Sequence, residues 1–227
     1  MKYKLIIFDL DGTILATGGD LCLAVNRALR KYGLPCHDEK TVLSFVGNGA
    51  YKLIERAVGG ADVDVNAVLE DYKQFYLEDC TTTTKPYPGI PQLLRDLRDC
   101  GVIVACNTNK PEAPAHKVLA RYLPGLIDFI QPQIDGVPRK PDPAGALKII
   151  DHFGVDLSEC IYVGDSDVDI RTAANAGIDV ISVSWGFKTH EFLAVAGAGK
   201  IADSVDELRA LFGIDDDAAG NSVKSSD

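Results

Sequence analysis

Residues 5–13 read Leu5-Ile6-Ile7-Phe8-Asp9-Leu10-Asp11-Gly12-Thr13, and this stretch decides the fold. Its four large apolar residues predict a short strand that is buried on both faces of a sheet. A buried carboxylate is costly unless it is paired or binds a metal, so we expect Asp9 and Asp11 where the strand leaves the sheet. Side chains at i and i+2 lean to the same side and converge on one cation or substrate. The alternative for this segment alone is a solvated loop after an edge strand.

The composition limits the classes of function. The chain has 227 residues, enough for one large domain or for a core with a smaller insert. Its 46% hydrophobic and 25% charged residues are ordinary for a soluble globular protein. The formal net charge of −10 argues against a nucleic-acid partner, because phosphate backbones are bound by concentrated Lys and Arg. A small anionic substrate remains compatible, since it needs only a local positive site.

The cysteines and the apolar runs indicate the compartment. The six cysteines are scattered and form no Cys-x-x-Cys pair, which suits a reducing cytosol better than a disulfide framework or a zinc site. No apolar run approaches the roughly 18 residues that span a bilayer. The first apolar stretch is too short and too acidic for a signal peptide. We therefore expect a cytoplasmic protein without a membrane partner.

The pattern along the chain changes near residue 85. Helices are expected in residues 20–31, with Asp20 as the cap, and in 38–46, 51–58 and 65–79, without a strand between them. After Tyr87, helices alternate with strands expected in 102–106, 127–130, 161–163 and 180–184. This alternation predicts an α/β fold, a doubly wound, Rossmann-like parallel sheet with an inserted α-helical cap. The expected division is a core of 1–16 and 84–212, a cap of 17–83 and a flexible C-terminal tail of 213–227.

Polar residues follow the expected strands, at the edge where open parallel sheets bind ligands. Thr108 and Asn109 follow the 102–106 strand, just before an expected helix amino terminus that favours a phosphate. Asp165 and Asp169 are four residues apart at the opening of a helix, and Lys140 precedes a Pro-Asp-Pro turn. Taken singly, Thr108 or Asn109 is equally a helix cap and Lys140 a surface lysine. Together with the first two aspartates they predict one site.

These segments resemble, in order and spacing, the motifs of the haloacid dehalogenase-like hydrolase superfamily. Asp9-Leu10-Asp11-Gly12-Thr13 is similar to the first motif, Thr108 to the second, Lys140 to the third, and Gly164-Asp165-x-x-x-Asp169 to the fourth. The likeness covers residues 1 to about 212. Phosphoglycolate phosphatase-type members are most similar, on the segments 45–50, 87–89 and 108–111. Residues 131–139 are less regular than this pattern implies, which bears on the third core strand.

The resemblance implies a role for each residue. Asp9 would be the nucleophile that forms an aspartyl phosphate, and Asp11 the acid and then the base. Mg²⁺ would be held by Asp9, the main-chain carbonyl of Asp11 and Asp165. Asp169 would orient a metal-bound water or Lys140. Thr108, Asn109 and Lys140 would bind the phosphate group of the substrate.

The resemblance also implies the reaction, with alternatives that stay open. The expected function is Mg²⁺-dependent hydrolysis of a small phosphorylated metabolite, with 2-phosphoglycolate as the leading candidate. A sugar-phosphate mutase (β-phosphoglucomutase-like), a pyrophosphatase or a nucleotidase would use the same scaffold, and a non-catalytic binding module is the third class. In the cap, Lys52 and Arg56 are cations within reach of a substrate carboxylate, although solvated charges on an amphipathic helix are the better explanation for them. No feature of the sequence predicts an oligomeric state.

Overall fold

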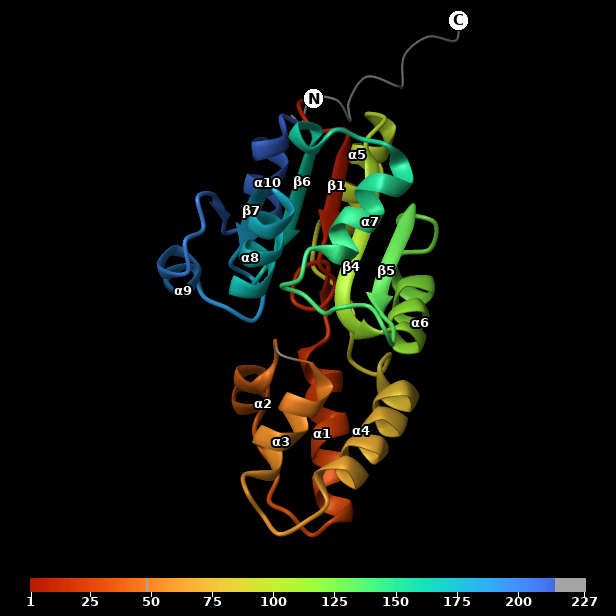
Figure 1. Ribbon diagram of the computed structural model, residues 1–227, viewed down its shortest axis with the longest axis vertical. Helices are drawn as coiled ribbons and strands as arrows, with labels where there is room; N and C mark the ends of the chain where they lie inside the picture. Colours follow the sequence, from red (N-terminus) through yellow and green to blue (C-terminus); the bar gives the residue numbers. More distant parts are fainter. Residues whose placement is uncertain (48, 215–227) are drawn as a thin grey trace, which may run out of the picture.

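The centre of the fold is a parallel sheet. A computed structural model describes residues 1–47 and 49–214. In that part of the chain the main sheet has six strands in the order β5-β4-β1-β6-β7-β8, and every neighbouring pair is parallel (Figure 1). The strands are β1 (Leu5–Phe8), β4 (Ile103–Pro111), β5 (Phe129–Gln133), β6 (Cys160–Gly164), β7 (Asp179–Val183) and β8 (Ile201–Ala202). The strand order reverses at β1, which places the polar segments after β1, β4 and β6 side by side.

Helices cover both faces of this sheet (Figure 1). Within β1, Ile6 and Phe8 point into one hydrophobic core and Leu5 and Ile7 into the other, all fully buried. The helices are α5 (Ile90–Asp99), α6 (Glu112–Tyr122) and α10 (Val205–Phe212) on the first core, α7 (Ala144–Phe153) and α8 (Asp167–Ala176) on the second, and α9 (His190–Val195) beside β8. The predicted strand with two buried faces and the doubly wound α/β fold are confirmed.

Four further helices are inserted between β2 (Leu15–Ala16) and β3 (Lys85–Pro86), which pair antiparallel. They pack against one another below the sheet in Figure 1. Their bounds are α1 (Gly18–Lys31), α2 (Glu39–Phe45), α3 (Ala50–Val58) and α4 (Val65–Asp79). The insert is all-helical, as the sequence pattern indicates.

Several local predictions need correction. Asp20 is not the cap of α1, because the helix begins at Gly18 after Thr17. The buried Asp20 carboxylate instead accepts hydrogen bonds from the main chain of residues 82–84, between α4 and β3. The strand expected in 127–130 is β5, shifted to Phe129–Gln133 by its pairing with β4. Helices α9 and α10 have no counterpart in the prediction.

Two further results concern the C-terminal residues and the possibility of a membrane span. Of the tail predicted in 213–227, only Gly213 and Ile214 lie within the described residues, and Ile214 packs on the hydrophobic core. Among the helices of the described chain, none has the length and apolar character needed to cross a bilayer.

Candidate active site

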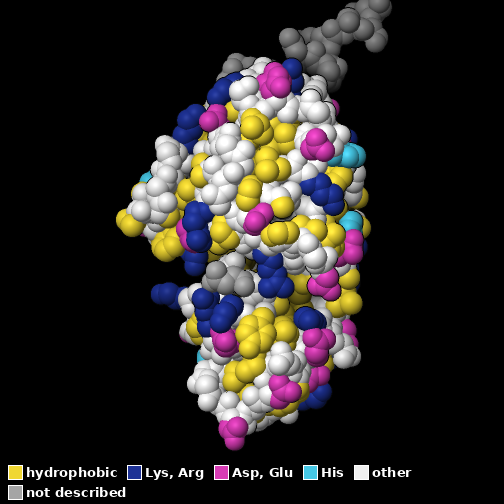
Figure 2. Space-filling model, in the orientation of Figure 1, with side chains coloured by type: hydrophobic (Ala, Val, Ile, Leu, Met, Phe, Trp, Pro, Cys, Tyr) yellow, Lys and Arg dark blue, Asp and Glu magenta, His cyan; other side chains and the backbone are white. Residues whose placement is uncertain are grey.

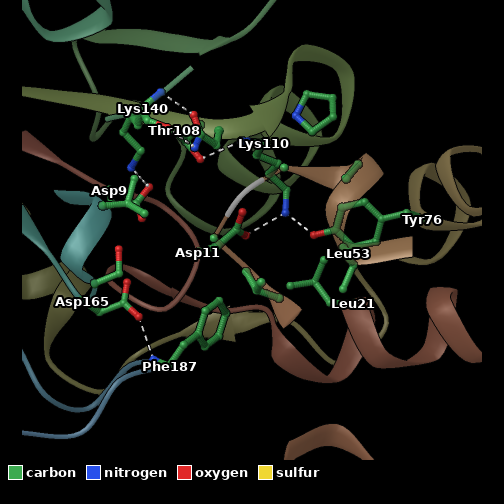
Figure 3. A pocket seen from close by; sticks show the side chains of 18 of the residues that line it. Asp9, Asp11, Leu21, Leu53, Tyr76, Thr108, Lys110, Lys140, Asp165 and Phe187 are labelled. Carbon is green, nitrogen blue, oxygen red and sulfur yellow. Dashed lines mark hydrogen bonds and ion pairs between the residues drawn. The ribbon is translucent and has the colours of Figure 1, made fainter. Parts of the chain in front are cut away.

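A cavity of about 100 Å³ lies between the carboxyl ends of the strands and the inserted helices. Asp9 and Asp11 follow β1, Asp165 follows β6, Thr108 lies in the last part of β4, and Lys140 lies in the loop before α7. Figure 3 shows their side chains pointing into the same space, with Leu21, Leu53 and Tyr76 of the inserted helices on the opposite side. The structure therefore brings together residues that are up to 156 positions apart, from Asp9 to Asp165.

Lys140 links two of the acids. Its ammonium lies 2.8 Å from Asp9 Oδ1 and 2.7 Å from Asp169 Oδ1, and its side chain is only 5% exposed. It also donates to the Tyr162 hydroxyl, which in turn donates to the main-chain carbonyl of Asn107. Burial opposes the charged form of Lys140, but the Asp169 and Asp9 carboxylates outweigh it and raise its pKa well above the usual value. Lys140 is therefore a fixed positive charge beside Asp9.

Asp169 and Asn109 hold Lys140 in place. Asp169 Oδ2 accepts from the main-chain N–H and the hydroxyl of Ser166, which completes a capping box at the start of α8. Asn109 accepts from the main-chain N–H of Lys140 and donates to its carbonyl. Asn109 thus has a positioning task that the sequence did not suggest, and its expected contact with substrate stays a prediction.

The Asp165 carboxylate is held by donors without a net charge. Thr13 Oγ1 donates to Asp165 Oδ1 at 3.0 Å, and the main-chain N–H of Phe187 donates to Oδ2 at 2.7 Å. Gly186 makes this approach possible, because a Cβ there would lie 2.3 Å from the Gly12 carbonyl oxygen and 2.4 Å from Asp165 Oδ2. Gly12 faces the same carboxylate at φ +83°, a left-handed conformation that favours glycine.

The carboxylates of Asp9, Asp165 and Asp169 form a cluster that fits a hard cation. One oxygen of each lies within 4.8 Å of the others. Burial raises the pKa of Asp9 to about 7, with Lys140 opposing the shift and Asp169 adding to it. Burial and the two neighbouring carboxylates raise the pKa of Asp165 well above its usual value. One ammonium does not balance three buried acids, and oxygen ligands of this kind are those that Mg²⁺ or Ca²⁺ prefers.

Thr108 lies on a strand rather than at a helix end. Strand β4 continues to Pro111 and the expected helix, α6, begins at Glu112, so Thr108 lies on the strand, four residues before the helix. The Thr108 hydroxyl is buried at the cavity and accepts from the main-chain N–H of Lys110 at 3.1 Å. Its own hydrogen is available to donate toward a bound group.

Lys110 and Tyr76 are lining residues that the sequence reasoning missed. The Lys110 ammonium lies 2.8 Å from Asp11 Oδ1, and it also donates to the hydroxyl of Tyr76 on α4 (Figure 3). Lys110 belongs to the segment 108–111 that carried the likeness to phosphoglycolate phosphatases, which was the available signal. Tyr76 is 34 residues away in the sequence, and no local pattern connects it to the site.

Basic side chains surround the cavity although the chain is acidic. Figure 2 shows Lys and Arg gathered on both sides of the hollow between the sheet and the inserted helices. Lys110, Lys140 and Lys188 are the cations that line the cavity among the described residues. A concave, locally positive surface attracts small anions by electrostatic steering.

Comparison with known proteins identifies the family. The family model described as haloacid dehalogenase-like hydrolase matches residues 6–183. A phosphoglycolate phosphatase of Pseudomonas putida is 35% identical, over 96% of this chain and 82% of its own. One of Rhodospirillum rubrum is 36% identical, over 90% and 89%.

The solved structures agree. A predicted phosphoglycolate phosphatase from Haemophilus somnus has a TM-score of 0.86 and 29% identity, covering 95% of this chain and 99% of its own. The match spans the sheet and the inserted helices alike. The chain therefore belongs to the haloacid dehalogenase-like hydrolase family.

Proposed function

We propose that this chain is a Mg²⁺-dependent phosphatase that hydrolyses a small phosphorylated metabolite, with 2-phosphoglycolate as the first candidate. The observation that carries the proposal is the convergence of Asp9, Asp11, Lys140 and Asp165 on one cavity. Two adjacent acids beside a fixed ammonium are the groups that a nucleophile and an acid–base catalyst require.

The chemistry follows from the positions of the side chains. Asp9 attacks phosphorus and forms an aspartyl phosphate, while Asp11 protonates the leaving oxygen and then deprotonates the attacking water. Lys140, which contacts Asp9, and the Thr108 hydroxyl hold the phosphoryl oxygens. Mg²⁺, held by Asp9, the Asp11 main-chain carbonyl and Asp165, would supply the charge that lets a phosphate dianion approach these carboxylates. Asp169 orients Lys140, with which it is paired.

Residues 17–83 would act as a cap over this cavity. Leu21, Leu53 and Tyr76 line it from the inserted helices, and two chain crossings join these helices to the sheet (Figure 1). A cap of this kind excludes water and selects the leaving group. We accordingly propose the division into a core of 1–16 and 84–212 and a cap of 17–83.

The size of the cavity and the names of the relatives support a small substrate. Pockets for drug-sized ligands measure roughly 300–1,000 Å³, whereas this cavity measures about 100 Å³. That volume favours a short phosphate ester over a nucleotide or a sugar bisphosphate. Relatives that cover most of the chain are named phosphoglycolate phosphatase. The six cysteines, all free in the structure, support the proposed cytoplasmic setting.

Release of inorganic phosphate from a panel of phosphate esters, with and without Mg²⁺, tests the proposal. The panel includes 2-phosphoglycolate, pyrophosphate, nucleotides and sugar phosphates without a bisphosphate primer. We expect Mg²⁺-dependent release, greatest with 2-phosphoglycolate, and a loss of roughly 10⁴-fold or more in Asp9→Asn. The exposed Asp99 on α5 provides the matched control, Asp99→Asn. Undiminished turnover in a folded Asp9→Asn enzyme would exclude the assigned nucleophile, and no release from any ester would favour a binding module.

A further inference from the structure

The cavity has a phosphoryl end and a leaving-group end. Asp9, Lys140 and Thr108 mark the first. In an in-line displacement the leaving group lies opposite the nucleophile, next to the group that protonates it. In this site that position is beside Asp11, toward the inserted helices (Figure 3).

Each cation that lines the cavity has a different environment. Lys140 is bound to Asp9 and Asp169 at the phosphoryl end. The Lys188 ammonium lies 5.3 Å from the centre of the Phe192 ring on α9, at the rim. Lys110 contacts Asp11 and is therefore the cation of the leaving-group end. The cap cations considered from the sequence do not line the cavity, since Lys52 pairs with Glu55 on the exposed side of α3 and Arg56 donates to the Phe45 carbonyl.

The Lys110 ammonium has one hydrogen-bond donor left for a second anion. Its side chain is 1% exposed, and a lysine ammonium has three N–H donors. Asp11 and the Tyr76 oxygen take two of them, and no third acceptor of the Lys110 ammonium occurs among the described residues. Tyr76 accepts from Lys110 and makes no other hydrogen bond in the described structure, so its hydroxyl hydrogen is available too. The Tyr72 ring stacks on Tyr76 at 5.6 Å and fixes its orientation.

The other cap residues that line the cavity offer little to a polar leaving group. Besides Gly47, Gly49 and the Tyr72 that stacks on Tyr76, they are apolar: Leu21, Val46, Ala50 and Leu53. Sugar hydroxyls would lose their hydrogen bonds against these walls, which is unfavourable. A single compact anion at the end of a short chain would find the Lys110 ammonium and the Tyr76 hydroxyl together.

We propose that Lys110 and the Tyr76 hydroxyl bind a carboxylate on the leaving group and thereby select phosphate esters of short hydroxy acids. The inference rests on the proposed phosphatase function. Binding occurs by two charge-assisted hydrogen bonds, with Lys110 bridging Asp11 and the substrate carboxylate. Because Tyr76 belongs to α4, the carboxylate also joins the cap to the core.

The test compares 2-phosphoglycolate with 2-phosphoglycolamide, which keeps the phosphate group and the chain length but has a neutral amide in place of the carboxylate. The readout is the ratio of kcat/KM for the acid to that for the amide. We expect the wild-type enzyme to favour the acid by about 10- to 100-fold, as for a hydrogen bond to a charged group, and Lys110→Met to bring the ratio near one. Tyr76→Phe keeps the ring and should lower the ratio by about 2- to 10-fold.

Lys117 on α6 provides the control. Its ammonium donates to main-chain carbonyls at the end of α4 and does not line the cavity. Lys117→Met removes a lysine at another contact between the same two parts, so it should leave the ratio unchanged. A Lys110→Met enzyme that loses equal activity on both esters would show that Lys110 only positions Asp11, and this would overturn the proposal.

A binding measurement separates this inference from the proposed function. Calorimetry on Asp9→Asn, with and without Lys110→Met, should give the same preference for the acid and the same loss of that preference. Wild-type turnover with equal kcat/KM on acid and amide would overturn the inference while the phosphatase function stands. Absence of turnover on every ester would overturn the function and this inference with it.

Discussion

Replacement of Asp20 tests whether one buried acid fastens the two linkers between the inserted helices and the sheet, the first at Thr17 and the second at residues 80–84. Asp20 is fully buried in the first turn of α1, directly after the first linker. Its Oδ1 accepts from the Thr83 N–H at 2.7 Å and the Thr83 hydroxyl at 2.6 Å, and its Oδ2 accepts from the N–H groups of Thr82 at 3.1 Å and Thr84 at 3.0 Å. These donors belong to the second linker, so the carboxylate holds the two chain crossings together.

The burial of the three threonines determines how much Asp20→Ala should lower the free energy of unfolding. Thr82 and Thr83 are exposed, so their donors regain water when the carboxylate is removed, whereas Thr84 is only 4% exposed. One buried N–H is then left unpaired, at about 1–3 kcal/mol. The side-chain cavity adds to this, and relief from burying a charge offsets part of it. We expect the free energy of unfolding to fall by about 2 kcal/mol.

Asp20→Asn tests the same hydrogen bonds with almost no change in side-chain size. Both carboxylate oxygens accept, so either orientation of the asparagine amide turns an NH₂ group toward two donors of the linker. The near-isosteric variant should therefore be at least as unstable as alanine. Urea unfolding measures the stability, and amide hydrogen exchange at Thr84 reports the linker itself. Stability within about 0.5 kcal/mol of wild type for both variants, with Thr84 still protected, would refute the linker contact.

Three further predictions concern separate parts of the chain. Gly186→Ala should destabilise the fold by about 1–3 kcal/mol and weaken Mg²⁺ binding by roughly tenfold or more, because the new methyl group displaces Asp165. Calorimetry that finds both the stability and the Mg²⁺ affinity unchanged would contradict this. Asp11→Asn should slow an alkyl phosphate more than an activated aryl phosphate, and equal losses in kcat would count against the acid role. The exposed His190 should titrate above 6.5 in an NMR experiment, because Asp203 raises its pKa, and Asp203→Asn should remove the shift. The pair's stabilisation is complete below the unfolded pKa and fades as pH rises through the raised value.

The parts of the fold that the sequence predicts are those governed by short-range patterns. Four apolar residues followed by Asp9 and Asp11 indicate a buried strand with a polar mouth, whatever lies elsewhere in the chain. Strand β5 shows the opposite case, because Gln131, Pro132 and Gln133 do not resemble a buried strand. Pairing with β4, from Ala105 to Pro111, imposes the extended conformation there.

The residues of the site also divide into those that short-range patterns predict and those that long-range contacts determine. Asp9, Thr108, Lys140 and Asp165 follow from motif order, and the topology of the sheet accounts for their meeting. Asp20 has the local sequence pattern of a helix cap, but its carboxylate accepts hydrogen bonds from donors more than 60 residues further along the chain. Tertiary partners of this kind leave no mark on the neighbouring residues.

The distribution of charge indicates how the parts of the site depend on one another. Lys140 pairs with both Asp9 and Asp169 and so offsets one of their two charges, and Lys110 offsets the charge of Asp11. Asp165 has no ion-pair partner among the described residues and is held only by the Thr13 hydroxyl and the Phe187 N–H. Asp165 is therefore the one of these four acids that contacts no ammonium in the described structure, and the close fit of Gly12 and Gly186 keeps it aimed at the neighbouring carboxylates. A cation bound at this cluster would therefore contribute most at Asp165, where it would replace a positive side chain that a phosphate-binding site otherwise needs.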